Sequence, residues 1–221
     1  MNKILLVFFV VFSFLLTSCN EKTDAVRAYY ENGNIKSELR YKDGKLNGEC
    51  KWFYSNGKPE MMVHYDMNVL NGEAMRWYEN GNEEARFYFK DNQYDSIFES
   101  YNVSGILVKK ENYKDGVLNG LTYQWYSNGK PFLEGEYLDG MMHGAWIMYY
   151  ENGSISSNAM YDKGTGTQRG YAPNGGYLMT FIKYKDNKKD GEEIHYDKYG
   201  NVTEIIVWDE GEYVGQKTIN E

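Results

Sequence analysis

The chain has 221 residues, with 32 acidic against 24 basic side chains and a net charge of −8 at pH 7. Nucleic acid is a poor candidate partner for so acidic a chain, because binding to phosphates depends on Lys and Arg. The composition, with 22 Tyr, 10 Phe, 5 Trp, 23 Gly and only 3 Pro, indicates a folded protein of many strands and tight turns, since disordered chains are poor in aromatic residues.

The first residues have the form of an export signal. Lys3 precedes an uncharged apolar run from Ile4 to Leu16, the pattern of a secretory n-region and h-region. A transmembrane helix needs roughly 20 apolar residues, which this run does not reach. We therefore interpret residues 1–18 as a cleaved signal peptide rather than a permanent anchor.

The segment Leu16-Thr17-Ser18-Cys19 resembles the lipobox of bacterial lipoproteins. The resemblance implies that Cys19 is acylated and becomes the first mature residue, with residues 19–25 as a tether. It also places the protein in the bacterial cell envelope, on the outer membrane rather than the inner one. The alternative is an ordinary signal peptide in which Cys19 is incidental. With Cys19 lipidated, only Cys50 remains, so no intramolecular disulfide is available.

A period of 24 residues dominates the rest of the chain, residues 26–221. The phrase Tyr-x-Asn-Gly recurs, and six successive glycines stand 24 residues apart, with two more at spacings of 22 and 25. We expect these eight to be structural turn glycines: Gly33, Gly57, Gly81, Gly105, Gly129, Gly153, Gly175 and Gly200. The period predicts about eight copies of one unit in a single repeat domain.

Two aromatic positions accompany each glycine. The residue four before it is aromatic in all copies: Tyr29, Phe53, Trp77, Tyr101, Trp125, Tyr149, Tyr171 and Tyr196. We expect these eight to form the packed face. The residue eight after it is aromatic in seven of eight copies.

Each unit has a second turn, as in Tyr41-Lys-Asp-Gly-Lys-Leu-Asn-Gly48, so that strand-length segments alternate with glycine-bearing turns. Asn-Gly between such segments predicts type I′ hairpins. We therefore expect an all-β fold: an elongated, single-layer antiparallel meander. Kinks or longer loops are expected at residues 89–96, which lack both turn glycines, and at residues 161–177, which carry an irregular glycine run.

The units resemble MORN repeats of the variant bacterial form; residues 29–49, from Tyr29-Tyr-Glu-Asn-Gly to Leu-Asn-Gly-Glu49, follow that pattern nearly position by position. The resemblance implies a protein-binding or scaffolding surface. Variant MORN chains include the YwqK-type family, named as antitoxins, which implies as an alternative a protein that sequesters a toxin. An export signal pulls against a cytoplasmic antitoxin, although an envelope immunity role would agree with both.

No catalytic or metal-binding pattern stands out. His64, His143 and His195 occupy different repeat positions, Cys50 has no companion, and phosphate-loop and nucleophile-elbow motifs are absent. We expect neither an enzyme nor a cofactor, and a small-molecule substrate is disfavoured. The expected partners are the membrane, through Cys19, and another protein; a glycan-binding module is a further alternative.

The remaining candidate site is a row of tyrosines three before the glycines: Tyr30, Tyr54, Tyr78, Tyr126 and Tyr150. Each follows the invariantly aromatic position, so in a strand the two point to opposite faces. We expect a half-exposed ladder that binds a partner, because tyrosine offers a large apolar area and a hydroxyl. The alternative is that the ladder only stiffens the sheet.

Overall fold

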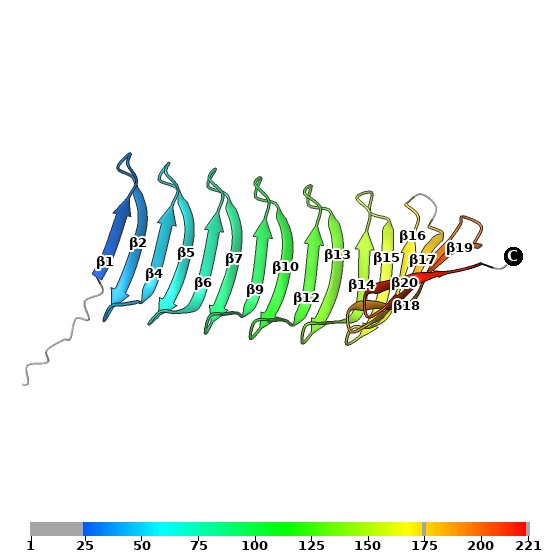
Figure 1. Cartoon of the computed structure of the whole chain (residues 1–221). Helices are drawn as coiled ribbons and strands as arrows, with labels where there is room; N and C mark the ends of the chain where they lie inside the picture. The colour runs from blue at the N-terminus through cyan, green and yellow to red at the C-terminus, as the bar shows by residue number, and fades with distance from the viewer. Residues whose placement is uncertain (1–23, 174–175, 220–221) are drawn as a thin grey trace, which may run out of the picture.

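The computed structural model describes residues 24–173 and 176–219. In these residues twenty strands form one antiparallel sheet in which neighbours in the chain pair with each other (Figure 1). The predicted all-β meander of hairpin repeats is confirmed. The predicted signal peptide, the predicted lipidation site Cys19, and Gly175 lie outside the described residues. Within the described part, no helix is long and apolar enough to cross a bilayer.

The strands, in chain order, are β1 (Asp24–Tyr29), β2 (Ile35–Lys42), β3 (Lys45–Leu46), β4 (Gly48–Phe53), β5 (Pro59–Asp66), β6 (Val69–Trp77), β7 (Glu83–Lys90), β8 (Gln93–Tyr94), β9 (Ser96–Tyr101), β10 (Leu107–Lys114), β11 (Val117–Leu118), β12 (Gly120–Trp125), β13 (Pro131–Leu138), β14 (Met141–Tyr149), β15 (Ile155–Asp162), β16 (Thr165–Tyr171), β17 (Leu178–Lys185), β18 (Lys188–Tyr196), β19 (Val202–Asp209) and β20 (Glu212–Lys217). Two kinds of turn connect them, and these lie in two rows along opposite edges of the body.

The tight turns have two residues each, as at residues 43–44 and 115–116. Both residues have positive φ, for example 51° at Asp43 and 74° at Gly44, which is the type I′ geometry. The prediction placed this geometry at Asn-Gly, whereas the tight turns begin with Asp, Met, Lys or Glu. The second Asn-Gly of the unit is instead a bulge: Asn47 separates β3 from β4, and Gly48 has φ 90°.

The segment without turn glycines folds as a regular unit, so the expected kink there is wrong. Asp91 and Asn92 take φ of 51° and 66°, and Ser96 takes φ of 67° at the bulge position. Asn and Asp tolerate this left-handed conformation better than other non-glycine residues. Because these residues accept the turn geometry, β7, β8 and β9 keep the standard hairpin register.

The wide turns have five residues, as at residues 30–34, and contain the Tyr-x-Asn-Gly phrase. In the first, the Tyr30 amide donates to Asn34 O and the Gly33 amide donates to Tyr30 O. The expected turn glycines that the structure describes all have positive φ, from 81° to 95°: Gly33, Gly57, Gly81, Gly105, Gly129, Gly153 and Gly200. The seventh wide turn differs, because it spans residues 172–177.

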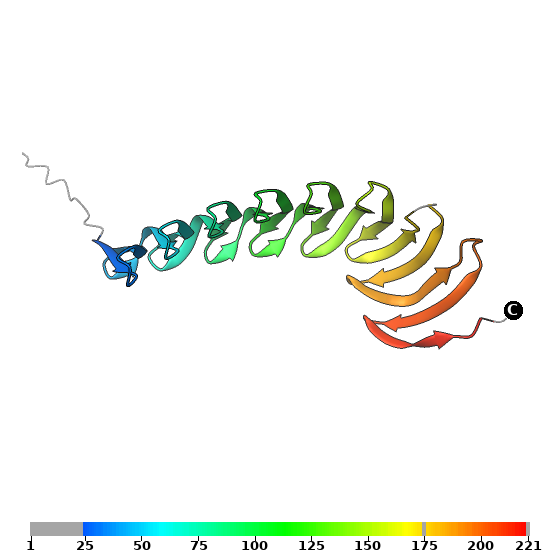
Figure 2. The same ribbon diagram turned by 90° about the horizontal axis from the view of Figure 1, so that it is seen from above.

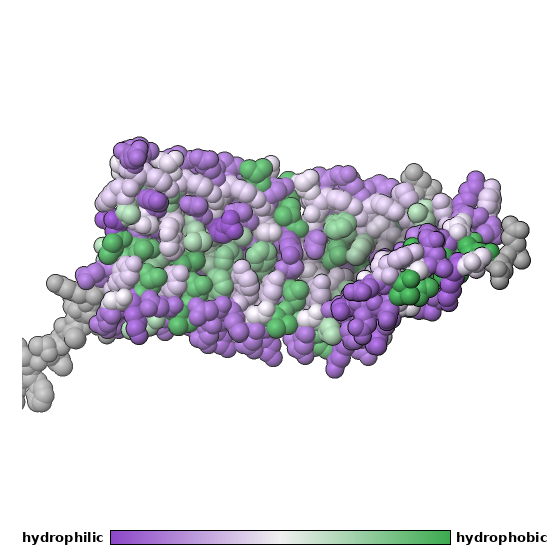
Figure 3. Space-filling model, viewed as in Figure 1, coloured by the Kyte–Doolittle hydropathy of each residue, from purple (hydrophilic) through white to green (hydrophobic). Residues whose placement is uncertain are grey.

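The hydrophobic core lies on one side of the sheet, which we call the packed face. One cluster contains Cys50, Val63, Ala74, Ala85 and Phe87, and a second contains Leu133, Trp146 and Tyr161. The other side is the open face. On the side of the molecule seen in Figure 3, hydrophobic residues gather along the middle of the sheet and hydrophilic ones along both rows of turns. The body therefore has polar edges around a lengthwise apolar band.

The C-terminal strands leave the line of the others. From about β16 onwards the sheet turns, so that β16 to β20 sweep away from the axis of the earlier hairpins (Figure 2). The turn begins in the segment with the irregular glycines. The two ends of the sheet, β1 and β20, lie far apart in the body (Figure 1).

Candidate functional site

The five ladder tyrosines connect each unit to the next. Their hydroxyls donate to a carbonyl oxygen of the next unit. In four cases it lies 23 residues further on: Tyr30 to Phe53 at 2.7 Å, Tyr54 to Trp77 at 2.7 Å, Tyr78 to Tyr101 at 2.9 Å and Tyr126 to Tyr149 at 2.7 Å. In the fifth, Tyr150 donates to Tyr171 O, 21 residues further on, at 2.8 Å. All five side chains are partly buried. Since each hydroxyl is already bonded within the sheet, this geometry favours the stiffening role over a free binding ladder.

Three units lack the ladder tyrosine. Asn102 replaces it in the fourth unit and donates through Nδ2 to Ser127 O at 3.0 Å, the equivalent of the Ser55 carbonyl that Asn32 reaches in the first unit. Ala172 and Asp197 stand at this position in the last two units. Asp197 instead accepts hydrogen bonds from the Tyr199 and Asn201 amides of its own turn. The ladder thus ends where the sheet turns away.

The invariantly aromatic position belongs to the open face, so its expected place on the packed face is wrong. Tyr101 donates to Glu99, Tyr149 to Glu134 and Tyr171 to Asn158. None of the eight residues Tyr29, Phe53, Trp77, Tyr101, Trp125, Tyr149, Tyr171 and Tyr196 belongs to either core cluster. The alternation of side chains along a strand places this position and its neighbour on opposite faces, but it does not say which face is buried. The buried face holds Cys50, Ala74 and Trp146 instead.

The open face carries a shallow hollow across β12, β13 and β14. Its volume is about 280 Å³, and its lining residues are Leu121, Tyr123, Glu134, Gly135, Glu136, Ala145 and Ile147. Gly135 is glycine for a reason on the other face, since a Cβ there would lie 2.3 Å from the Trp146 ring on the packed face. Leu121 is 49% exposed. The hollow therefore combines an apolar surface with two carboxylates.

These two carboxylates lack a basic partner, unlike most glutamates on the strands. Glu38 is bonded to Arg27, Glu99 to Lys110 and Glu192 to Lys217, and in each pair the hydrogen bond from the basic group lowers the pKa of the carboxyl. Among the described residues, no ion pair involves Glu134 or Glu136; Glu134 accepts only the Tyr149 hydroxyl. The hollow thus has negative charge available to a cationic group from outside.

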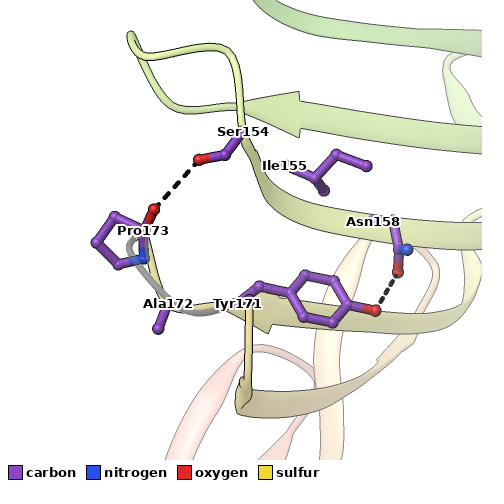
Figure 4. A pocket seen from close by; sticks show the side chains of 7 residues that line it. Ser154, Ile155, Asn158, Tyr171, Ala172 and Pro173 are labelled. Carbon is purple, nitrogen blue, oxygen red and sulfur yellow. Dashed lines mark hydrogen bonds between the residues drawn. The ribbon is translucent and has the colours of Figure 1, made fainter.

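A larger hollow lies at the seventh wide turn. Its volume is about 420 Å³, and Ser154, Ile155, Asn158, Tyr171, Ala172, Pro173 and Gly176 line it. In Figure 4 the Tyr171 ring lies along it with its hydroxyl bonded to Asn158, and Ser154 reaches Pro173 O. Residues 174–175 of this turn lie outside the described residues, so we assign no function to this hollow.

The histidines are dispersed, as their sequence positions predict. His64 contacts Glu73 O, His195 contacts Glu193, and His143 lies 3.4 Å from Asp162. In the part of the chain that the structure describes, no three His, Cys, Asp or Glu side chains are grouped to hold a metal ion.

The fold and its surfaces define a class: an elongated hairpin-repeat protein that presents a long single sheet. Four segments, residues 25–43, 46–67, 118–139 and 142–163, match the family described as MORN repeat variant. These four segments are similar to MORN-variant repeats. The comparison with curated proteins gave no match.

Proposed function

We propose that the protein is a lipid-tethered scaffold of the bacterial cell envelope that holds a partner protein against its open face. The observation that carries the proposal is the hollow over β12 to β14, where Leu121, Tyr123 and Ile147 adjoin two carboxylates without basic partners. MORN-variant repeats agree with a protein-binding or scaffolding role.

A lysine-bearing segment of a partner fits this surface. Lysine lays an apolar stem on apolar surface and keeps its ammonium at the edge. Leu121 and Ile147 offer that surface on either side of β13, which carries Glu134 and Glu136. Burial of such a charge pair at an interface contributes to specificity through complementary charge.

Carbodiimide crosslinking in intact envelopes tests the proposal, because it joins a carboxylate to a lysine in direct contact. Wild type should yield a crosslinked partner, and Glu134→Gln/Glu136→Gln should lower the yield about tenfold or more. Glu60→Gln, at an exposed strand glutamate of β5, is the matched control and should leave the yield unchanged. An equal yield from the double variant would remove the hollow from consideration.

The tether is tested separately at Cys19. Palmitate labelling should mark wild type but not Cys19→Ser, and the variant should move to a soluble fraction, because acyl chains supply the membrane affinity. Equal labelling of both proteins would contradict lipidation.

Toxin sequestration in an immunity role is the second candidate function. The acidic hollow favours it, since a basic protein surface would find complementary charge there. If the crosslinked partner arrests growth when produced alone, and co-production of this protein relieves the arrest, the scaffold is an immunity protein. A partner without such toxicity would exclude this role.

A further inference from the structure

The N-terminal end of the sheet leaves a core position uncovered. Val26 in β1 occupies the repeat position of Cys50, Ala74 and Thr122, which are 0%, 0% and 2% exposed, whereas Val26 is 53% exposed. In the interior of the sheet, the preceding unit covers this position: Leu39 of β2 packs against the cluster that contains Cys50. Among the described residues, no unit precedes β1 and covers Val26.

The same end presents two carbonyl groups whose equivalents in the second, third and fourth units accept a tyrosine hydroxyl and an asparagine side chain from the preceding unit. The Tyr30 hydroxyl and the Asn32 side chain of the first unit donate to Phe53 O at 2.7 Å and Ser55 O at 2.8 Å. Tyr54 and Asn56 repeat this pair of bonds on Trp77 O and Glu79 O.

By the 24-residue period, the equivalent acceptors in the first unit are Tyr29 O and Glu31 O. Among the described residues, no tyrosine or asparagine side chain reaches either of them. They form a pair of open acceptors with a fixed spacing along the chain.

The C-terminal end differs in the composition of its edge strand. Strand β20 is flanked by charges, with Lys217 bonded to Glu192 and Gln216 bonded to Glu204, devices that protect an edge from further pairing. Strand β1, with the sequence Asp-Ala-Val-Arg-Ala-Tyr, has six exposed residues and one bonded charge, Arg27 with Glu38, but unlike β20 it contains neither Lys nor a central Gly.

Strand direction excludes head-to-tail stacking of identical copies through the antiparallel pairing that joins neighbouring units within the sheet. Both β1 and β20 run from the row of tight turns to the row of wide turns. A second copy stacked end to end would therefore place β20 parallel to β1, whereas every pairing in the sheet is antiparallel. In the described part of the chain, β20 is not followed by a Tyr-x-Asn-Gly turn.

We propose that the β1 edge is a docking site for a strand of another protein that enters from a Tyr-x-Asn-Gly turn and runs antiparallel to β1. Its tyrosine and asparagine side chains bond to Tyr29 O and Glu31 O, and an apolar residue of the strand covers Val26. The chemistry is strand addition to a sheet edge, in which main-chain bonds give affinity and side-chain positions give specificity. This site lies apart from the hollow over β12 to β14 and goes beyond the scaffold function proposed above.

The probe for this site is a synthetic peptide of residues 30–42 of this chain, which contains the Tyr-x-Asn-Gly turn and the strand that follows it. In the intact sheet this segment binds β4, with Ser37 opposite Trp52 and Glu38 opposite Lys51. On β1 its Glu38 would face Arg27 by the same register. Fluorescence polarisation with the full mature chain, lipid anchor kept in detergent, measures the affinity.

The peptide with Tyr30→Phe and Asn32→Ala should bind roughly tenfold more weakly, because it loses two hydrogen bonds. Val26→Glu in the protein should weaken binding at least as much. Val214→Glu, at the 62% exposed position of β20, is the matched control and should bind as wild type. Hydrogen exchange should show new protection at residues 24–29 with peptide bound.

Three results would overturn the inference: a scrambled peptide that binds as tightly, equal losses for Val26→Glu and Val214→Glu, or a dimer of the chain alone that Val26→Glu dissociates. The last would make a second copy the occupant. Carbodiimide crosslinking through Glu134 and Glu136 should be unchanged in Val26→Glu, so failure of this site and failure of the scaffold proposal are distinguishable.

Discussion

The regular hairpins up to β14 and the turned end from β16 onwards use the same unit but stack it differently. In the regular part, each tight turn bonds to the preceding one 22 residues away, as from the Asn68 amide to Leu46 O and from the Gly116 amide to Tyr94 O. At the turned end, Asn187 reaches past the neighbouring turn to Met142 N and Gly140 O, 45 and 47 residues away. The tight turn at residues 163–164 thus lies between two tight turns that are hydrogen-bonded to each other.

The glycine run explains how this closer stacking is accommodated. A Cβ at Gly166 would lie 2.0 Å from Met160 O. A side chain at this position would therefore clash with the backbone of β15. The turned end thus keeps the same repeat but carries a glycine where a side chain does not fit.

The largest effect is expected from Gly166→Val. The new side chain meets backbone that has no room to yield, so the free energy of unfolding should fall by about 3 kcal/mol or more, in the range of severe steric changes. Denaturant unfolding measures it. Gly215→Val in β20, where a Cβ would have no atom within 4 Å, should differ from wild type by less than about 1 kcal/mol. Similar losses of unfolding free energy at both sites would show that crowding at Gly166 does not determine the change in direction of the sheet.

Asn187→Ala should act through the long-range bonds of its side chain. It removes two hydrogen bonds, worth about 1 kcal/mol each, and should speed amide exchange at Met142. Asn92→Ala is the matched control, because Asn92 has a similar φ, 66° against 64°, but makes one side-chain bond, from the Leu70 amide. Equal losses of stability for the two variants would mean that the bridge across the neighbouring turn contributes nothing.

Removal of a ladder hydroxyl should have a smaller effect. Tyr54→Phe deletes the bond to Trp77 O and should lower the melting temperature by an amount that corresponds to about 1 kcal/mol. Tyr199→Phe, at a ring that is 77% exposed, should leave it unchanged. A normal melting temperature for Tyr54→Phe would show that the ladder does not stabilise the regular part.

Acid should weaken the turned end through Glu193. Burial by itself would raise the pKa of this carboxyl, but hydrogen bonds from Lys189, His195 and Trp208 hold it below its ordinary value of 4.5. A lowered folded pKa contributes stability that is present above about pH 4.5 and is lost as pH falls through the folded value.

Melting curves between pH 6 and pH 3 measure this contribution, which we expect to be the smallest of the four. The loss of melting temperature on acidification should be smaller in Glu193→Gln than in wild type. Amide hydrogen exchange should differ between the two proteins only in β18 and β19. Parallel curves for the two proteins would contradict the assignment.

The sequence by itself determined the unit. The 24-residue spacing of the glycines, the two aromatic positions and the alternating strands and turns predict an antiparallel meander, because local backbone preferences and short hairpins decide such a fold. The lipobox resemblance at Cys19 is also a sequence result, and it stays a prediction.

Only the tertiary structure decided which side of the sheet is covered. Alternation separates Trp125 from its neighbour Tyr126 but is symmetric between faces, and burial depends on how neighbouring hairpins curve against one another. The same holds for the ladder hydroxyls, which bond to carbonyl groups 21 or 23 residues away, and for Asn187, whose partners lie two tight turns back. Contacts between units depend on how the units stack, and a period in the sequence gives only the number and spacing of those units.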